Sequence, residues 1–160
     1  MRTAHIEPCQ FPGVDNDDQG TPGDIVDGDW RIHVLQLPWR DDKPEVSREP
    51  SGVKLILKWG NSPKHGPCYI CAKASDGRTM IEVHSANVAG DASNGFASQL
   101  EGCFAPGLSF VLFPVGTKLN DKLTLGKAQW GVSGSKEAVE EFVKHFQDSD
   151  GNHEDIELTT

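Results

Sequence analysis

Short apolar segments separated by glycine, proline and acidic turns make up most of the chain. Residues 24–37 surround Asp27-Gly28, a dipeptide that favours a tight β-turn, and the segment after it alternates, with Trp30, Ile32 and Val34 on one face. We therefore predict a β-hairpin at this position. Three further segments have strand character: residues 53–59, 67–73 and 79–83. Asp76-Gly77 predicts a turn between the last two of them.

The second half of the chain adds two more β segments and the one long helical pattern. Residues 108–115 predict an apolar strand, residues 117–132 a second hairpin and residues 94–102 a short helix. From Ser135 onward, apolar side chains recur at helical spacing, which predicts a helix capped by Ser135 whose apolar stripe packs on the sheet. The stripe comprises Val139, Phe142, Val143 and Phe146. The predicted fold class is mainly β, a single β-rich domain that is sandwich-like or barrel-like and has one C-terminal helix.

The two ends of the chain are polar and acidic. Residues 1–22 are rich in turn-forming residues and are predicted to be a flexible N-terminal segment. Residues 147–160 carry several aspartates and glutamates and few apolar side chains, which predicts a disordered acidic tail. The β-rich domain is therefore expected to span residues 23–146.

Composition and charge exclude several classes of function. The formal net charge of −9 comes without a lysine or arginine cluster, so we expect no binding to nucleic acid. No apolar run reaches the length of a membrane-spanning helix, and the N-terminus lacks the apolar core of a signal peptide. We therefore expect no membrane association and a location in the cytoplasm, where the four cysteines are reduced thiols.

A strand that ends in a histidine and a turn that carries a cysteine are the candidates for chemistry. His84 follows a predicted strand, and Cys103 follows Gly102 in a predicted tight turn. A thiol becomes a nucleophile when a neighbouring base or oriented backbone amides lower its pKa. The intervening loop is long enough to bring the two side chains together, and Ser85 and Asn87 are candidates to fix the imidazole tautomer.

Each of these features has a structural alternative. Cys103 can be a small buried thiol without reactivity, and His84 a surface histidine at a strand end. Cys68 and Cys71 form a Cys-x-x-Cys pair, but residues three apart on a strand point to opposite faces, so buried strand thiols are favoured over a zinc or redox site. A metal site that adds His65 is the alternative; we expect no metal and no cofactor.

The corner Pro38-Trp39-Arg40-Asp41 also has two interpretations. It can be a recognition corner in which Trp39 and Arg40 contact a ligand. Alternatively, Trp39 covers the edge of the core and Arg40 pairs with Asp41 or Asp42 on the surface. The second interpretation is favoured.

Several short motifs, taken together, carry a family resemblance. In chain order they are Pro38-Trp39-Arg40-Asp41, Pro50-Ser51-Gly52, Ser62-Pro63-Lys64-His65-Gly66, residues 81–87 and residues 100–107. This ordered set resembles a small family, common in bacteriophage genomes, that is catalogued as a domain of unknown function. The resemblance covers about residues 20–110 and implies a phage protein located in the host cytoplasm or associated with the virion.

The His84 strand end and the Gly102-Cys103 turn are also similar to the signature of L,D-transpeptidases, which are β-rich peptidoglycan enzymes. The resemblance implies that Cys103 is the nucleophile, that His84 is the base and that the amides of Gly102 and Cys103 form the oxyanion hole. Glu101 stands where those enzymes carry a histidine, and it is a candidate to orient His84. The implied activity is cysteine-dependent acyl transfer, hydrolytic or cross-linking, on peptidoglycan stem peptides. The alternative is a non-enzymatic phage protein that captures a small host molecule or docks on a host or virion protein.

Overall fold

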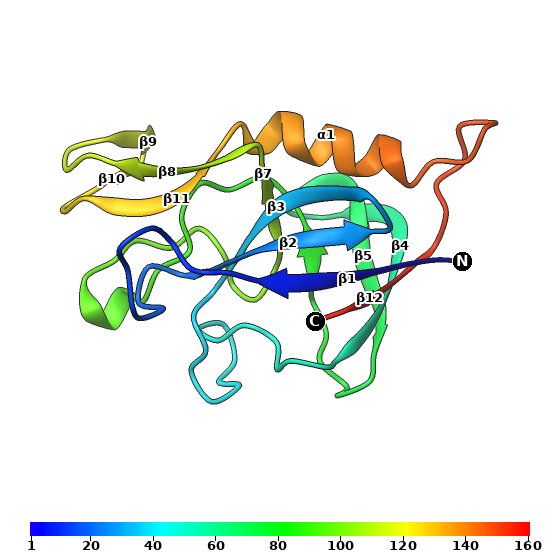
Figure 1. The fold of residues 1–160 in the computed structure, drawn as a ribbon, viewed down its shortest axis with the longest axis horizontal. Coiled ribbons are helices and arrows are strands. Elements are labelled where there is room, and N and C mark those ends of the chain that lie inside the picture. Colours follow the sequence, from blue (N-terminus) through cyan, green and yellow to red (C-terminus); the bar gives the residue numbers. More distant parts are fainter.

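The computed structural model describes all 160 residues, and its largest feature is an eight-stranded sheet that curls into a nearly closed barrel (Figure 1). The strand order is β6-β5-β4-β12-β1-β2-β3-β7, and neighbouring strands are antiparallel except for β1 and β12. The strands are β1 (Arg2–Pro8), β2 (Thr21–Asp27), β3 (Trp30–Gln36), β4 (Lys54–Ser62), β5 (Gly66–Ala74), β6 (Glu82–Val83), β7 (Ala105–Gly107) and β12 (Ile156–Thr159). The predicted mainly β fold is therefore confirmed, and it is barrel-like.

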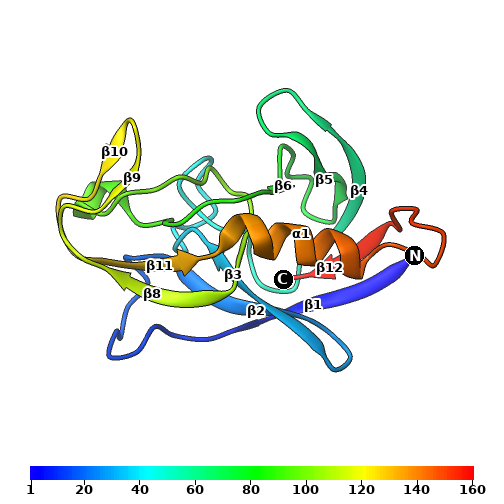
Figure 2. The same ribbon diagram turned by 90° about the horizontal axis from the view of Figure 1, so that it is seen from above.

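Two small sheets and one α-helix complete the fold (Figure 2). β8 pairs with β11 and β9 pairs with β10, both antiparallel, and together they extend from one end of the barrel. Their bounds, with those of the helices, are β8 (Ser109–Phe113), β9 (Lys118–Asn120), β10 (Leu123–Thr124), β11 (Gln129–Ser133), α1 (Ser135–His145) and a single 3-10 turn, η1 (Ala92–Asn94). The chain contains no helix that is long and apolar enough to cross a membrane.

Helix α1 packs on the main core as predicted, although Val139 of the predicted stripe is not part of that core. Phe142 and Phe146 are fully buried with Ala138, whereas Val143 is only partly buried. The predicted cap is wrong in detail, because Gly134 occupies the N-cap position. The Ser135 hydroxyl instead donates to the Pro106 carbonyl and accepts from the Ala86 amide, and so fastens the helix start to β7.

Both chain ends are parts of the sheet, which corrects two predictions. Residues 1–22 are not a flexible segment, because β1 lies between β12 and β2 and buries Ala4 and Ile6. Residues 147–160 are not a disordered tail, because β12 lies between β4 and β1 with Ile156 and Leu158 fully buried. The physical reason is the alternation of apolar and polar residues in each short strand, which gives the barrel interior one apolar face.

The helix predicted over residues 94–102 does not form. Only η1 is helical there, and Asp91 caps its start through the Ser93 amide. Gly95 ends the turn in a left-handed conformation with φ 84°, and the chain then continues as irregular backbone with an isolated bridge between Ala89 and Ser98.

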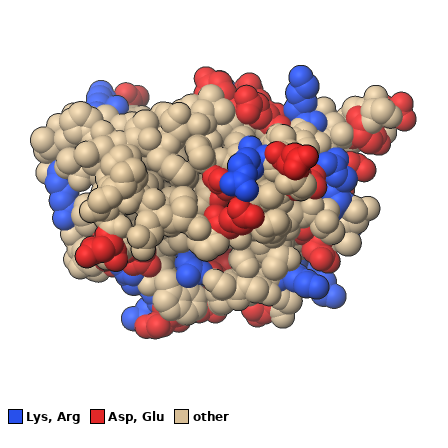
Figure 3. Space-filling view, in the orientation of Figure 1, with Lys and Arg blue, Asp and Glu red and all other residues tan.

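The barrel closes where β6 meets the segment that leads into β7. Val83 and Phe104 form a parallel bridge. The His84 amide donates to the Phe104 carbonyl at 3.1 Å, and the Phe104 amide donates to the Glu82 carbonyl at 3.0 Å. Val83 and Phe104 point into the core, so Glu82, His84 and Cys103 lie on the other face of this seam. The surface seen in Figure 3 carries interspersed basic and acidic side chains without an extended patch of one sign.

Candidate active site

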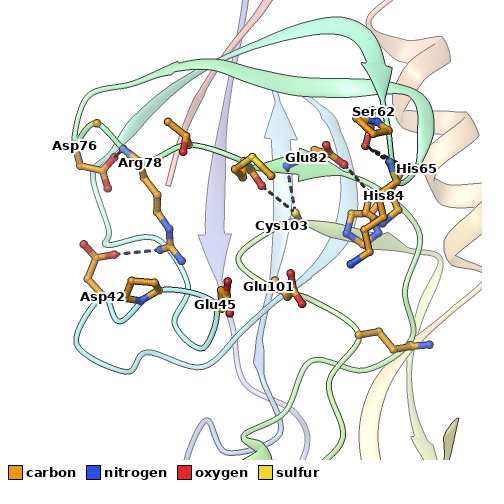
Figure 4. A pocket seen from close by; sticks show the side chains of 17 residues that line it. Asp42, Glu45, Ser62, His65, Asp76, Arg78, Glu82, His84, Glu101 and Cys103 are labelled. Atoms are coloured by element: carbon orange, nitrogen blue, oxygen red, sulfur yellow. Dashed lines mark hydrogen bonds and ion pairs between the residues drawn. The ribbon is translucent and has the colours of Figure 1, made fainter. Parts of the chain in front are cut away.

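A cavity of about 630 Å³ opens on the outer face of the barrel seam (Figure 4). Five segments contribute to its wall: residues 42–45, 62–65, 76–80, 82–84 and 99–103. β6 is paired with β5 and bridged to Phe104, the residue after Cys103. Most of the remaining wall comes from loops between strands. Both of the residues singled out as nucleophile and base, Cys103 and His84, line this cavity.

Cys103 is held as a neutral thiol. Its side chain is buried, donates a hydrogen bond to the Met80 carbonyl at 3.6 Å and accepts one from the Glu82 amide at 3.4 Å. Burial raises the pKa of this thiol, the Glu82 amide lowers it, and the Glu82 and Glu101 carboxylates raise it further, with a net increase. The thiol is therefore protonated at neutral pH in the ligand-free protein.

His84 is held as a neutral imidazole with one free nitrogen. Its side chain is 92% buried, since the residue retains 8% of its exposure. Nδ1 lies 3.0 Å from the Ser85 carbonyl oxygen, an acceptor, so Nδ1 carries the hydrogen and donates it. Burial lowers the pKa of the imidazole. Nε2 therefore presents a lone pair to the cavity and has no partner in the protein.

The structure brings His84 and Cys103 into one cavity without a hydrogen bond between them. The Cys103 proton points to Met80, and the imidazole is oriented by Ser85. The role expected for Glu101 is also different, because Glu101 lines the cavity but makes no hydrogen bond to His84. The orienting group for the imidazole is a backbone carbonyl.

Two residues that the sequence-based prediction left out of the site adjoin it. Nδ1 of His65 lies 2.6 Å from the Glu82 carboxylate, and the His65 ring stacks on His84 with centroids 3.8 Å apart. Burial raises the pKa of Glu82, but hydrogen bonds from His65 and Ser62 lower it, with a net decrease. The signal for Glu82 was its position two residues before His84, which puts both on one face of β6.

The turn residues Gly102 and Cys103 keep their amides free. Neither N–H donates to an acceptor within the protein. Gly102 has φ 114°, a conformation that favours glycine, and a Cβ at this position would lie 2.9 Å from an Arg78 guanidinium nitrogen. Both amides therefore lack an acceptor in the protein, but only Cys103 lines the cavity and Gly102 does not.

Trp39 and Arg40, predicted as binding residues with a structural alternative, both make structural contacts, but the predicted pairing of Arg40 with Asp41 or Asp42 is wrong. Neither lines the cavity, and the Trp39 ring lies under the Arg48 guanidinium at 5.3 Å. The guanidinium of Arg40 bonds to three carboxylates that come from distant loops: Asp17 at 2.9 Å, Asp18 at 2.7 Å and Asp91 at 2.6 Å. The corner therefore fastens the 17–18 loop to the 91–94 turn.

Ser85 and Asn87 also act through the fold. Ser85 contributes its carbonyl to His84, and its side chain is exposed. The Asn87 side chain donates to the Val132 carbonyl at 3.0 Å, and the Asn87 backbone amide donates to the side-chain oxygen of Gln99. Asn87 therefore joins the His84 loop to β11 and does not contact the imidazole.

All four cysteines are free thiols. Cys68 and Cys71 lie on β5 as the strand interpretation requires, Cys68 buried and Cys71 partly buried. No group of three or more histidine, cysteine, aspartate or glutamate side chains has an arrangement that could hold a metal ion.

Replacement of Gly102 by alanine should destabilise the protein and disturb the Cys103 turn. The new Cβ meets Arg78, whose guanidinium is held by Asp42, Glu49 and the Ser47 carbonyl. We expect the free energy of unfolding to fall by about 2 kcal/mol in denaturant titrations. Gly116→Ala is the matched control: Gly116 also has positive φ, at 85°, but has open space around it, so its loss should be about 1 kcal/mol. Equal losses in both variants would contradict the close packing against Arg78.

A buried acid, Glu49, lies behind the cavity wall against Arg78. Glu49 is fully buried, lies 3.0 Å from Arg78 and shares a hydrogen bond with Asp76. Burial, and then the Asp76 side chain, raise the pKa of Glu49 to about 8. Asp76 itself lines the cavity and has a lowered pKa: burial raises it, and the Glu49 hydrogen bond then lowers it. Glu49 therefore holds a proton that it shares with an ionised Asp76.

Glu49→Gln should change how stability depends on pH. An acid whose folded pKa lies above its unfolded value keeps its proton in the native state, so it lowers the free energy of unfolding as pH rises from about 4.5 to about 8. The glutamine variant lacks this loss. We expect its stability relative to the parent protein to increase by on the order of 2–4 kcal/mol between pH 5 and pH 8.5 in urea titrations. A difference that does not vary with pH would show that Glu49 is ionised throughout.

A scan against protein-family models and searches of curated proteins and of solved structures found no match to this chain.

Proposed function

We propose that this cavity is the active site of a phage-encoded cysteine-dependent acyl-transfer enzyme that acts on peptidoglycan stem peptides. The observation that carries the proposal is the shared cavity of Cys103 and His84, in which the imidazole Nε2 is an unpartnered acceptor. The free amides of Gly102 and Cys103 add donors for an oxyanion beside the thiol. The choice of stem peptides, and of a phage protein, rests on the resemblance of the His84 and Gly102-Cys103 motifs.

In the proposed reaction, substrate binding replaces the thiol hydrogen bond to Met80 by one to His84. The Cys103 proton passes to His84 Nε2 while the sulfur attacks the carbonyl carbon of a stem-peptide amide. The amides of Gly102 and Cys103 donate to the oxygen that becomes negative. Breakage of the C–N bond then expels the amine, which takes the proton from the imidazolium, and a thioester remains on Cys103.

The second half of the proposed reaction regenerates the thiol. Water or a second amine attacks the thioester and gives its proton to His84. The C–S bond breaks, and the departing sulfur takes that proton. Water yields a free carboxylic acid, which is hydrolysis, and an amine yields a new amide, which is cross-linking. A neutral, buried His84 suits both steps, because its lone pair is already available at neutral pH.

A second candidate function is supported by the resting state of Cys103. The thiol donates its hydrogen bond to the Met80 carbonyl and not to His84, and burial raises the pKa of the thiol. Those features suit a binding protein that captures a small host molecule, or docks on a host or virion protein, without chemistry. For either function we propose that the protein works in the host cytoplasm or in the virion.

Turnover distinguishes the two functions. The experiment incubates the protein with muropeptides released from purified cell walls and follows products by liquid chromatography and mass spectrometry. The enzyme proposal expects shortened or cross-linked stem peptides with the parent protein and none with Cys103→Ser. Ligand retained at one equivalent, with unchanged muropeptides, would favour the binding protein.

A further inference from the structure

The carboxylates of the cavity are not balanced by cations. Five aspartates and glutamates line it, against one lysine and one arginine. Three of the five have partners in the protein, since Asp42 pairs with Arg78, Glu82 with His65, and Asp76 with Glu49. The remaining two, Glu45 and Glu101, make no ion pair and no hydrogen bond with another side chain.

The two free carboxylates belong to exposed residues on loops at the cavity. Glu101 is two residues before Cys103 and contributes to the increase of its pKa. Glu45 lies in a loop with φ 67°, a left-handed conformation that is uncommon for a residue other than glycine. Figure 4 shows both side chains among those around the cavity. Lys64, the unpaired cation of the wall, lowers the pKa of Cys103 by more than Glu101 raises it, whereas the Glu82 carboxylate has a larger effect than either.

An independent feature is an acceptor in the cavity wall that no donor of the protein reaches. His84 is 92% buried, since it retains 8% exposure, and its Nε2 accepts no hydrogen bond from the protein. Nε2 itself stays accessible from the cavity, so water or a ligand there can supply the donor that the protein does not. The Met80 carbonyl adds another acceptor on the same wall, occupied only by the weak thiol donor.

We propose that the cavity selects ligands that carry a positively charged ammonium group, held by Glu45 and Glu101 next to Cys103. An ammonium group supplies both the charge that the two carboxylates lack and the donors that the acceptors of the wall need. For the acyl-transfer function, the group belongs to the acyl donor and lies beside the carbonyl that is attacked. The charge preference does not depend on turnover, so it holds for a binding protein as well.

Charged thiol reagents measure this preference at Cys103 itself. The probes are 2-aminoethyl methanethiosulfonate, which is cationic, and 2-sulfonatoethyl methanethiosulfonate, which is anionic. In both, the Cys103 sulfur forms a disulfide with the alkyl-bearing sulfur, and methanesulfinate leaves as the thiol proton passes to solvent. Cys9 is exposed and reacts in the same tube, so its ratio of cationic to anionic rates reports the net charge of the whole protein. Peptide mass spectrometry separates the two sites.

We expect the cation-to-anion rate ratio at Cys103 to exceed the ratio at Cys9 by at least about tenfold at low ionic strength. The double variant Glu45→Gln/Glu101→Gln should bring the Cys103 ratio close to that of Cys9. The control Glu137→Gln/Glu140→Gln makes the same change in net charge on the exposed side of α1 and should leave the ratio unchanged.

Three results would overturn the proposal. They are a Cys103 ratio no greater than that of Cys9, a ratio that does not respond to the loss of Glu45 and Glu101, and labelling of Cys9 without any cationic labelling of Cys103. None of these readings uses a stem peptide. A protein that fails to process muropeptides can therefore still pass this test, and an active enzyme can fail it.

Discussion

Deletion of residues 153–160 should abolish the cooperative folding of the whole protein. The deletion removes β12, which supplies hydrogen bonds to β4 on one side and to β1 on the other. It also removes the fully buried side chains of Ile156 and Leu158 from the main core. Two buried aliphatic side chains and both sheet pairings together exceed the 5–15 kcal/mol that stabilises a typical domain. Thermal unfolding followed by circular dichroism should show no cooperative transition.

Point substitutions in β12 give a graded form of the same prediction. Ile156→Ala or Leu158→Ala should lower the free energy of unfolding by about 2–5 kcal/mol each. Glu157→Ala is the matched control, because Glu157 lies between them with its side chain on the other face of the strand and is partly exposed, so its change should stay within about 1 kcal/mol. A cooperative transition in the deletion variant at the parent temperature would mean that the C-terminal strand is not part of the sheet.

Cys103→Ser and His84→Ala should each remove nearly all acyl-transfer activity. Serine at position 103 replaces the sulfur nucleophile by a hydroxyl that the neutral imidazole deprotonates far less readily. We expect a loss of at least about 10³-fold in turnover. Alanine at position 84 removes the proton acceptor, for an expected loss of about 10²–10⁴-fold. Turnover is measured with the muropeptide assay.

The dependence on pH separates the role of His84 from a structural one. Because burial lowers its pKa below the ordinary value of 6.5, the activity of the parent protein should decline only at pH values below 6.5. His5→Ala and Cys9→Ser serve as controls, since both residues are exposed and lie outside the cavity. Activity in His84→Ala that matches the parent at every pH would assign the base to another group.

Alternation along individual strands predicted much of the barrel and one face of the site. The hairpin around Asp27-Gly28 follows from local pattern and is present, with Gly28 and Asp29 between its strands. The strand predicted over residues 79–83 is present only as Glu82–Val83. The same alternation put Glu82 and His84 on one face of β6. What it could not predict is the parallel bridge between Val83 and Phe104, which closes the barrel and fixes which residues share the cavity.

The misplaced chain ends show why non-local pairing escapes a local pattern. β12 has only four residues inside an acidic segment, so composition predicted disorder, yet Ile156 pairs with Arg2 on one side and Leu57 on the other. Arg40 is a similar case. The local pattern predicted pairing with the neighbouring Asp41 or Asp42, whereas its partners Asp17 and Asp91 are far from it in sequence.

The most direct test of the proposed active site is the mass of the intact protein after brief exposure to a complete muropeptide digest, with acid quenching to preserve thioesters. The account predicts a covalent adduct with the mass of a stem-peptide acyl group on the parent protein, located on Cys103 by peptide mapping. Cys103→Ser should carry no such thioester, and His84→Ala should form the adduct at least about 10²-fold more slowly. Muropeptide turnover that persists in Cys103→Ser, or a parent protein that shows neither adduct nor turnover with any component of the digest, would contradict it.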